Sequence, residues 1–456
     1  MAKKNKTVFV CQECGYESPK WIGQCVCGAW NSFVEEKVYS DTEKQNDSRS
    51  RKVDGKKTKA VKLSEIKSDQ KDRLDTKIEE LNRVLGGGIV KGSLTLIAGE
   101  PGIGKSTLIL KTANNIADNN GTVLYVSGEE SEEQIKMRED RISDHIPDNL
   151  LLLSETNIET ITEIIGNVKP EFLIIDSIQT MYTDTLDSAP GSVSQIRSST
   201  NELMKIGKVM NIPTFIVAHV TKSGDLAGPK IIEHLVDCVL HFSGDRNQDL
   251  RILRSNKNRF GTTSEIGAFE MKEQGLVEVR NISASFLEGL DETGEGSIAT
   301  AVYEGTRPLL LELQALTSTA NAGFPRRTAL GVDINRLNMI IAVLERKGGI
   351  NLSIQDVYVN VVGGIKPEGT SIDLAVALAI YSSSNGVSNT KNTLAIGEIG
   401  LTGDLRQVRN ADKITNEAQR LGFKRIILPK KNAEKISQSG IEIIGVSNVK
   451  HAMSRL

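Results

Sequence analysis

The sequence predicts an α/β protein with a parallel β-sheet at its centre. Short apolar runs rich in β-branched residues, such as "TLIAG", "VLYVS", "FLIID" and "TFIVAH", are separated by helical stretches that include 105–118 and 194–210. Buried strands that alternate with helices are typical of parallel sheets. A glycine-rich turn, "GEPGIGKST", joins one of these runs to a helix, and four of the five cysteines crowd into residues 11–27 ahead of the sheet.

Length and composition indicate a globular chain of several domains. The chain has 456 residues, 39% of them hydrophobic and 25% charged, with a net charge of −2. This length suits two to four domains with buried cores. Because there is no overall basic excess, nucleic-acid binding would require local basic patches. The sequence has no apolar run long enough for a membrane span and no export signal in its first residues, so we expect a cytoplasmic protein without a membrane partner.

The cysteine cluster predicts a small zinc finger over residues 1–34. Cys11, Cys14, Cys25 and Cys27 supply four thiolates, a donor set that suits tetrahedral Zn²⁺. The second pair is separated by one residue instead of the usual two or more, and the alternative interpretation is a set of free thiols. Residues 35–60 are polar and charged, which is typical of a flexible linker.

The glycine-rich turn predicts a site for ATP with Mg²⁺. It fits the pattern G-x-x-x-x-G-K-[ST], in which backbone N–H groups and a helix N-terminus surround phosphate oxygens. Lys105 would reach the β- and γ-phosphates, and the Ser106 hydroxyl would bind Mg²⁺. The predicted nucleotide-binding residues are Gly99, Glu100, Pro101, Gly102, Ile103, Gly104, Lys105, Ser106 and Thr107.

Acidic residues at two further strand ends predict the rest of a hydrolytic site. Asp176 ends "FLIID" and would hold Mg²⁺ or its water. Glu129 and Glu130 follow "VLYVS", where a carboxylate can polarise a water that attacks the γ-phosphate. Of the two we favour Glu129 as the catalytic residue. The alternative is a solvated acidic helix start.

Polar groups after the strand "TFIVAH" suggest a sensor of the γ-phosphate. His219 ends this strand and Thr221 follows it, and we predict the sensor role for these two residues. A structural histidine is the alternative. Further along, Lys257 and Arg259 flank Asn258 in "KNRFG". Their phosphate could belong to a nucleotide in the same chain, a nucleotide in a neighbouring chain, or a nucleic-acid backbone.

Taken together, the four-cysteine module and the stretches "GEPGIGKST", "YVSGEES", "IIDSIQT", "HVTKSGDLAGPKIIEHLVD" and "KNRFG" closely resemble the bacterial RadA (Sms) family of DNA-repair proteins over nearly the whole chain. The resemblance implies a RecA-like P-loop ATPase core, here over residues 61–285, that works as a homo-hexamer. It implies ATP-driven branch migration or unwinding of single-stranded and branched DNA beside the RecA recombinase. It also implies that Lys257 and Arg259 act catalytically on the nucleotide of a neighbouring subunit. We therefore expect "RILRSNKNRFG" to follow the sheet, at a subunit edge.

Residues 286–456 resemble the proteolytic domain of Lon in fold, through "NVVGGIKPEGTSIDLAVALAI" and "AIGEIGLTGDLRQVRNADK". Ser371 falls where that family has its nucleophile, but Arg406 stands where it has the lysine base. Arginine stays protonated and cannot act as a base, so we expect no proteolysis. We predict instead that Ser371 caps the helix that follows it, with Asp373 in the first turn.

Basic residues in and near this domain suggest a path for DNA. We predict phosphate contacts for Lys222, Arg326, Arg327 and Arg336, which would be sensitive to salt and indifferent to base sequence. The alternative is that these side chains simply form solvated faces. A second function for the whole chain is a nucleotide-switched scaffold that needs no DNA, like the clock ATPase KaiC, which shares the RecA-type core.

Overall fold

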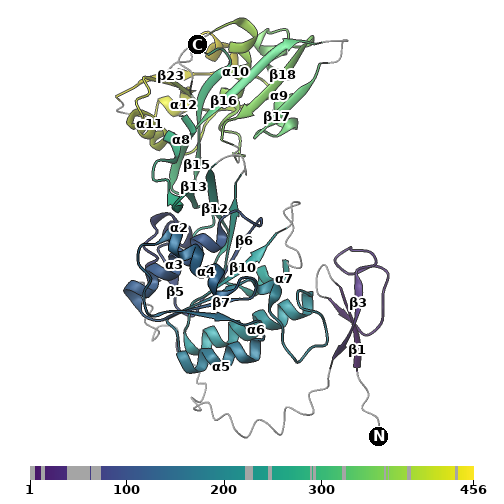
Figure 1. Cartoon of the computed structure of the whole chain (residues 1–456). Helices are drawn as coiled ribbons and strands as arrows, with labels where there is room; N and C mark the ends of the chain where they lie inside the picture. Colours follow the sequence, from purple (N-terminus) through teal and green to yellow (C-terminus); the bar gives the residue numbers. More distant parts are fainter. Residues whose placement is uncertain are drawn as a thin grey trace, which may run out of the picture. The chain divides into compact units, whose positions relative to one another are not determined.

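A computed structural model describes residues 6–11, 16–38, 62, 73–220, 230–244, 249–287, 290, 294–320, 325–363, 366–367, 369–387, 392–436 and 440–456. The chain divides into two compact units, Met1–Glu278 and Val279–Leu456 (Figure 1). The domain limits expected from the sequence stay predictions. No helix of the described residues is long and apolar enough to cross a membrane.

The N-terminal residues form a small antiparallel sheet around the cysteines. Strand β1 (Lys6–Cys11) pairs with β2 (Glu17–Ser18) on one side and β3 (Phe33–Val38) on the other. In this register Cys11 lies opposite Phe33, and both are buried with Cys25 in one apolar cluster. Cys14 lies outside the described residues.

The main sheet of the first unit is parallel in its central part, as the sequence predicts. Among the described residues, nine strands run in the order β14-β13-β12-β11-β6-β10-β9-β7-β8. The parallel strands are β6 (Leu94–Gly99), β7 (Val123–Ser127), β8 (Leu150–Ser154), β9 (Phe172–Asp176), β10 (Thr214–His219) and β11 (Cys238–Ser243). An antiparallel extension adds β12 (Leu250–Asn258), β13 (Ile266–Lys272) and β14 (Gly275–Glu278).

This extension corrects one expectation from the sequence. The stretch "RILRSNKNRFG" does not follow the sheet. Most of it is strand β12, which pairs with β11 on one side and β13 on the other. Only Arg259, Phe260 and Gly261 continue past the end of β12. The polar residues of this stretch hide its strand character, since Arg251, Ser255 and Lys257 all lie in β12 beside the buried Ile252 and Leu253.

Helices cover both faces of this sheet, and each face has its own apolar core (Figure 1). One core joins the sheet to α2 (Glu79–Leu85), α3 (Lys105–Asn120) and α4 (Glu132–Ile142), and the other joins it to α5 (Ile158–Val168), α6 (Val193–Met210) and α7 (Lys230–Leu235). A 3₁₀ turn, η3 (Ile178–Thr180), follows β9, and a short ribbon pairs β4 (Arg73–Leu74) with β5 (Ile89–Val90). Both predicted helical stretches, 105–118 and 194–210, are confirmed by α3 and α6.

The second unit is a mixed sheet with its own helices. Within its described residues, seven strands run in the order β17-β18-β16-β15-β19-β22-β23. Their bounds are β15 (Ser297–Glu304), β16 (Arg307–Thr319), β17 (Arg327–Leu330), β18 (Gln355–Val361), β19 (Thr393–Ala395), β22 (Arg425–Pro429) and β23 (Glu442–Val446), and β20 (Glu398–Ile399) pairs separately with β21 (Leu405–Arg406). The helices are α8 (Ile282–Leu287), α9 (Ile334–Val343) with a π-turn η5 (Leu344–Gly348), α10 (Asp373–Asn385), α11 (Ala411–Arg420), α12 (Lys430–Ala433) and α13 (Val449–Met453).

Helix α10 is buried and begins later than the sequence suggested. Its N-cap is Ile372, without a side-chain capping bond, so the prediction that Ser371 caps this helix is wrong. The Ser371 hydroxyl instead donates to the Ala301 carbonyl at 3.4 Å. Asp373 does lie in the first turn, as predicted, where its carboxylate accepts hydrogen bonds from Arg336 and from the N–H of Ile399.

Candidate nucleotide-binding site

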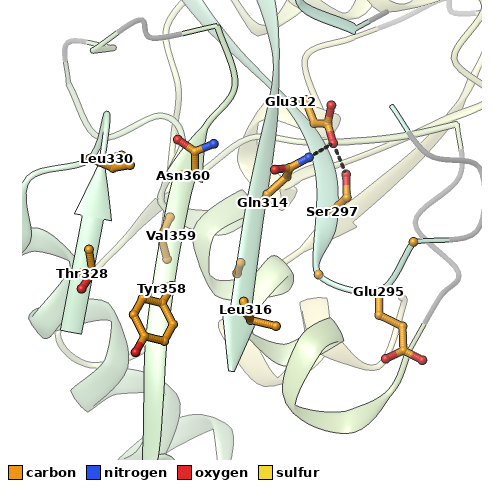
Figure 2. Close-up of a pocket in the computed structure, with 13 residues that line it drawn as sticks. Glu295, Ser297, Glu312, Gln314, Leu316, Thr328, Leu330, Tyr358, Val359 and Asn360 are labelled. Carbon is orange, nitrogen blue, oxygen red and sulfur yellow. Dashed lines mark hydrogen bonds between the residues drawn. The ribbon is translucent and has the colours of Figure 1, made fainter. Parts of the chain in front are cut away.

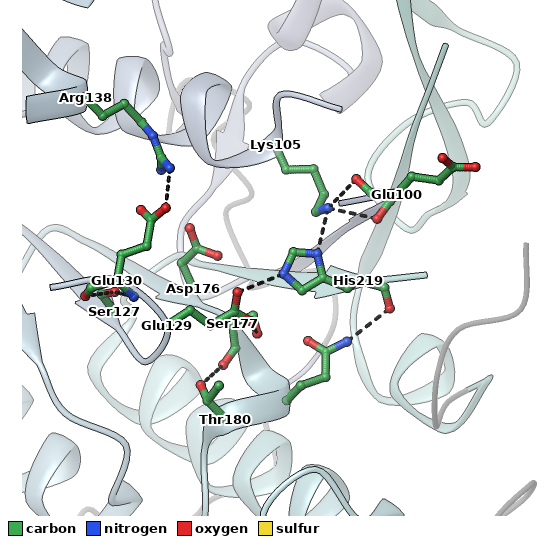
Figure 3. A network of polar contacts seen from close by, with 12 residues as sticks. Glu100, Lys105, Ser127, Glu129, Glu130, Arg138, Asp176, Ser177, Thr180 and His219 are labelled. Atoms are coloured by element: carbon green, nitrogen blue, oxygen red, sulfur yellow. Dashed lines mark hydrogen bonds and ion pairs between the residues drawn. The ribbon is translucent and has the colours of Figure 1, made fainter. Parts of the chain in front are cut away.

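Four adjacent parallel strands bring the predicted site residues to one edge of the sheet. In the spatial order β6, β10, β9, β7, the carboxyl ends of all four strands meet at the same edge. The register places Gly99 beside His219 and Ser127 beside Asp176. Ligands of open α/β sheets bind at this edge. Residues that are far apart in the sequence therefore form one polar network (Figure 3).

The glycine-rich loop leads directly into α3 and holds Lys105 inside. Gly102 and Gly104 have φ angles of +78° and +111°, which favour glycine. Gly104 is the N-cap of α3 and makes no side-chain capping bond, so no side chain of the cap competes for the first N–H groups of the helix. Lys105 is 3% exposed, and its Nζ donates to the carbonyls of Gly99 at 2.8 Å and Glu100 at 3.0 Å. A loop of this geometry fits phosphate oxygens.

Burial changes the acidity of the Lys105 ammonium group. Removal from water lowers the pKa of Lys105 from 10.5 to about 8, although the carboxylates of Asp176 and Glu129 act in the opposite direction. The protonated form of Lys105 is therefore stabilised by nearby negative charge. A phosphate group at this loop would supply more of it.

His219 lies between the lysine and the favoured glutamate. Its Nδ1 is 3.1 Å from Lys105 Nζ, and its Nε2 is 3.1 Å from Glu129 Oε2 (Figure 3). Ser177 donates its hydroxyl hydrogen to the other oxygen of Glu129. The contact with His219 lowers the pKa of Glu129, burial opposes it, and the Ser177 bond lowers it further, with a net shift below the ordinary value. Glu129 is thus a carboxylate held from two sides.

The neighbouring glutamate points elsewhere. Glu130 forms an ion pair with Arg138 of α4, and its backbone carbonyl accepts a bond from the Ser127 hydroxyl at 2.7 Å. In Figure 3 the side chains of Glu129 and Glu130 diverge, one toward His219 and one toward Arg138. The two consecutive carboxylates therefore have different partners.

Asp176 is held by a tyrosine from the adjacent strand. Tyr125 donates its hydroxyl hydrogen to Asp176 Oδ2 at 2.6 Å, and Asp176 is only 7% exposed. Burial, followed by the negative charge of Asp176, raises the pKa of Tyr125 well above its ordinary value, so the phenol stays a donor. Asp176 is the last residue of β9, and Ser177 follows it directly.

Sequence reasoning did not assign roles to three side chains of this network. Ser177 contacts Glu129, Tyr125 contacts Asp176, and Gln179 donates its Nε2 hydrogen to the His219 carbonyl at 3.1 Å. Each lies in or just after a predicted strand, which was the available signal. Their partners come from other strands, so the contacts could not be read from local spacing.

The two cations of "KNRFG" bind groups of their own unit. Lys257 Nζ donates to carbonyls at the end of α7, those of Glu233 at 2.6 Å and Val236 at 2.8 Å. Arg259 forms an ion pair with Asp237 at 3.1 Å and is 54% exposed at its side chain. Within the described ranges, neither cation shares a hydrogen bond or ion pair with Lys105, Glu129 or Asp176. Their predicted catalytic role concerns a neighbouring subunit and stays a prediction.

The described thiols of the N-terminal sheet of β1, β2 and β3, called the N-terminal ribbon from here on, lie close together. The Sγ atoms of Cys11, Cys25 and Cys27 all lie within 4.8 Å of one another, and those of Cys11 and Cys27 are 3.9 Å apart. Ligands of tetrahedral zinc with bonds of about 2.3 Å are roughly 3.8 Å apart. The donor set therefore fits Zn²⁺ even with the short spacing of the second pair. The isolated Cys238 is 2% exposed, as expected for a core residue, and burial raises the pKa of its thiol to about 12.

The remaining predicted site residues fall in different surroundings. Thr221 and Lys222 lie outside the described residues. Arg326 is exposed, while Arg327 donates to the carbonyls of Leu352 at 2.8 Å and of Gln355. Arg336 pairs with the buried carboxylate of Asp373 and donates to the Ile399 carbonyl at 2.9 Å. Two of these three guanidinium groups thus bind their own unit, and DNA contact stays a prediction for all of them.

Comparisons with known proteins agree with this division of the chain. A family model described as an AAA domain matches residues 60–225, one described as a rubredoxin metal binding domain matches residues 9–35, and one described as subunit ChlI of Mg-chelatase matches residues 332–432. The chain thus combines a metal-binding module, an AAA-type ATPase core and a C-terminal domain similar to part of ChlI.

Curated relatives match the chain from end to end. A protein named DNA repair protein RadA from Halalkalibacterium halodurans is 51% identical over 456 residues, which cover 99% of each chain. Proteins of the same name from Bacillus subtilis and Listeria monocytogenes are 48% and 47% identical, and cover 99% and 100% of this chain and 98% and 99% of their own. Identity at this level over the full length means that the chain belongs to the DNA repair protein RadA family.

Proposed function

We propose that this chain is an ATP-driven motor that acts on single-stranded and branched DNA in recombinational DNA repair. The observation that carries the proposal is the position of His219, which contacts Lys105 on one side and Glu129 on the other. A phosphate-binding lysine and a carboxylate suited to hold water are thereby joined through one imidazole. The name shared by the relatives, DNA repair protein RadA, supports DNA as the polymer on which the motor acts.

ATP binds through the loop that precedes α3. The uncapped start of α3 and the Lys105 ammonium group face the phosphates, and their positive character compensates the phosphate charge. The Ser106 hydroxyl and the Asp176 carboxylate are oxygen donors of the kind that Mg²⁺ prefers. When bound, Mg²⁺ neutralises charge that develops between the β- and γ-phosphates.

Hydrolysis depends on Glu129. Its carboxylate accepts hydrogen bonds from Ser177 and His219, which fix its orientation, and it accepts a proton from the attacking water. When γ-phosphate draws Lys105 away from the loop carbonyls, the Lys105–His219 contact changes with it. His219 therefore senses the γ-phosphate, and Gln179 of η3, which donates to the His219 carbonyl, moves with it.

Coupling to DNA takes place between subunits of a homo-hexamer. Lys257 and Arg259 approach the nucleotide of the neighbouring subunit and neutralise charge in its transition state, as arginine fingers do. Hydrolysis thereby moves neighbouring subunits relative to one another, and this movement drives branch migration or unwinding of DNA beside the RecA recombinase. The zinc ribbon serves as a docking module for DNA or a partner, and contacts to the DNA backbone come from Lys222 and the arginines of the C-terminal domain.

The test is the ATPase rate with and without single-stranded DNA at two salt concentrations. We expect DNA to stimulate hydrolysis and the stimulation to fade at higher salt, because phosphate contacts release counterions. The Lys105→Ala variant, which removes the phosphate-binding cation, gives the background rate. A working ATPase without stimulation at either salt would replace the motor by the nucleotide-switched scaffold.

A further inference from the structure

We propose that the C-terminal unit holds a pocket for an arginine side chain of a partner protein. The pocket is a cavity of about 420 Å³ on one face of the sheet, over β15, β16, β17 and β18 (Figure 2). This volume is within the range of about 300–1,000 Å³ that is usual for ligand sites. The whole cavity lies in the second unit, so the inference is independent of the ATPase function proposed above.

Strand register gathers the lining side chains on that face. Along β16, Glu312, Gln314 and Leu316 are alternate residues and share one face. Tyr358 pairs with Leu316, and the lining residue Asn360 pairs with Gln314, so the same face continues across β18. Leu313, which lies between Glu312 and Gln314 in β16, points to the other side and is fully buried.

Glu312 is the feature that points to a ligand. It is 1% exposed, and its Oε1 accepts hydrogen bonds from the Ser297 hydroxyl and from Gln314 Nε2, both at 2.8 Å (Figure 2). Its other oxygen, Oε2, is buried and has no hydrogen-bond partner within the described residues. Buried carboxylate oxygens in proteins nearly always have a partner. Glu312 lines the cavity, and an N–H donor that enters it and displaces the Gln314 side chain would reach this carboxylate.

The charge of the cavity lining favours a cationic ligand. Among the described residues, the lining contains two carboxylates, Glu295 and Glu312, and no lysine, arginine or histidine. Such a pocket repels phosphate, so nucleotides and nucleic acid are disfavoured as occupants. A cationic donor instead gains a charge-assisted hydrogen bond from Glu312.

The rest of the lining favours arginine over lysine. Leu316 and Leu330 are 62% and 63% exposed and can pack against an aliphatic side-chain stem. Tyr358 offers a ring face to a cation. The amide groups of Gln314 and Asn360 add oxygen acceptors beside the carboxylate, which suits the five donors of a planar guanidinium better than the three of an ammonium. An arginine presented on a polypeptide meets all of these features.

The experiment is a titration of the full-length chain with acetyl-arginine-N-methylamide, followed by methyl NMR of Leu316 and Leu330. We expect saturable shifts of both methyl groups. The neutral citrulline analogue has the same length but no charge, and it should bind about tenfold more weakly or worse. Glu312→Gln should weaken the arginine probe by about the same factor, whereas Glu295→Gln, on the exposed rim, is the matched control with a smaller effect.

Several results would overturn the proposal. They are the absence of saturable shifts, equal binding of the arginine and citrulline probes, or an unchanged response in Glu312→Gln. Shifts of the same methyl groups with ATP or an oligonucleotide, and none with the arginine probe, would assign the cavity to an anionic ligand instead. The comparison of the two probes uses the unaltered chain, so it decides the matter even if Glu312→Gln fails to fold.

Discussion

His219 Nε2 lies 3.1 Å from Glu129 Oε2, across a gap of 90 residues in the sequence. The contact joins the ends of β10 and β7, which are separated in the sheet by β9. The same imidazole reaches Lys105 with its other nitrogen. A single side chain therefore connects the residue that we assign to phosphate binding with the residue that we assign to water activation.

The first prediction concerns which glutamate is catalytic. Glu129→Gln should lower the ATPase turnover by about 100-fold, because the amide cannot accept the proton of water. ATP binding, measured by fluorescence with a labelled analogue, should be nearly unchanged. Glu130→Gln should lose less, since Glu130 binds Arg138, and the exposed Glu132→Gln is the matched control. A larger loss in Glu130→Gln than in Glu129→Gln would reverse the assignment.

The second prediction is a pH dependence of ATP affinity. The pKa of Lys105 in the free protein is about 8, so the cation is present below that pH and is lost above it. Affinity should be constant from pH 6.5 to about 7.5 and then weaken, approaching about tenfold per pH unit. Unfolding of the protein would not explain this loss of ATP affinity. A lysine whose pKa is lower in the folded state binds fewer protons there, so this group makes the folded state relatively more stable as the pH rises from 8 toward 10.5. A flat affinity up to pH 9.5 would contradict the assignment.

The third prediction separates two roles of Lys257. Lys257→Ala removes hydrogen bonds to the carbonyls at the end of α7, which should cost about 1 kcal/mol of unfolding free energy. It should also lower DNA-stimulated ATPase activity. Mixed assemblies of Lys257→Ala and Lys105→Ala chains should recover some activity if the cation acts on a neighbouring subunit. The surface variant Lys272→Ala is the control, and failure of every mixture to recover activity would favour a role within the same chain.

The fourth prediction concerns the metal. Metal analysis of protein kept reduced should find about one zinc per chain, and Cys27→Ser should lower that content. Cys238 is buried and lies outside the cysteine cluster, so the Cys238→Ala variant should keep the same zinc content as the unaltered protein. Chelation should remove the order of the ribbon, because so small a module depends on metal for most of its folding free energy. Reduced protein without zinc would refute the site.

The fifth prediction tests whether Arg336 serves the fold or DNA. Arg336→Ala leaves the buried Asp373 carboxylate without its guanidinium partner, which should destabilise the protein by about 3 kcal/mol in denaturant unfolding. Arg326→Ala removes an exposed side chain and should change the stability by less than about 0.5 kcal/mol. A stable Arg336→Ala protein with weaker DNA binding would show that the DNA role outweighs the structural one.

The C-terminal domain shows how far local patterns reach. The apolar residues Ile334, Leu337, Ile341 and Leu344 repeat at helical spacing ahead of Gly348 and Gly349, a pattern that predicts a helix ending at the glycines. Helix α9 with its π-turn ends there, with Gly349 at a φ of +79°, although Ile334 is 40% exposed. The same kind of reasoning failed for Ser371. A capping residue must lie directly before the first helical residue, and α10 starts at Asp373, so Ile372 and not Ser371 is its N-cap.

By itself, the sequence determined the phosphate loop, the central strands and helices, and the cysteine cluster. These features depend on neighbouring residues: apolar periodicity, glycines in a short turn, and thiols a few positions apart. The tertiary structure alone decided that β10 lies between β6 and β9, that Glu129 and not Glu130 meets His219, and that β12 lies within the sheet. It also decided that Glu312 is buried with one oxygen that has no partner in the described part of the chain. The physical reason is that strand order and cross-strand contacts arise from pairing between segments far apart in the chain, which local periodicity does not encode.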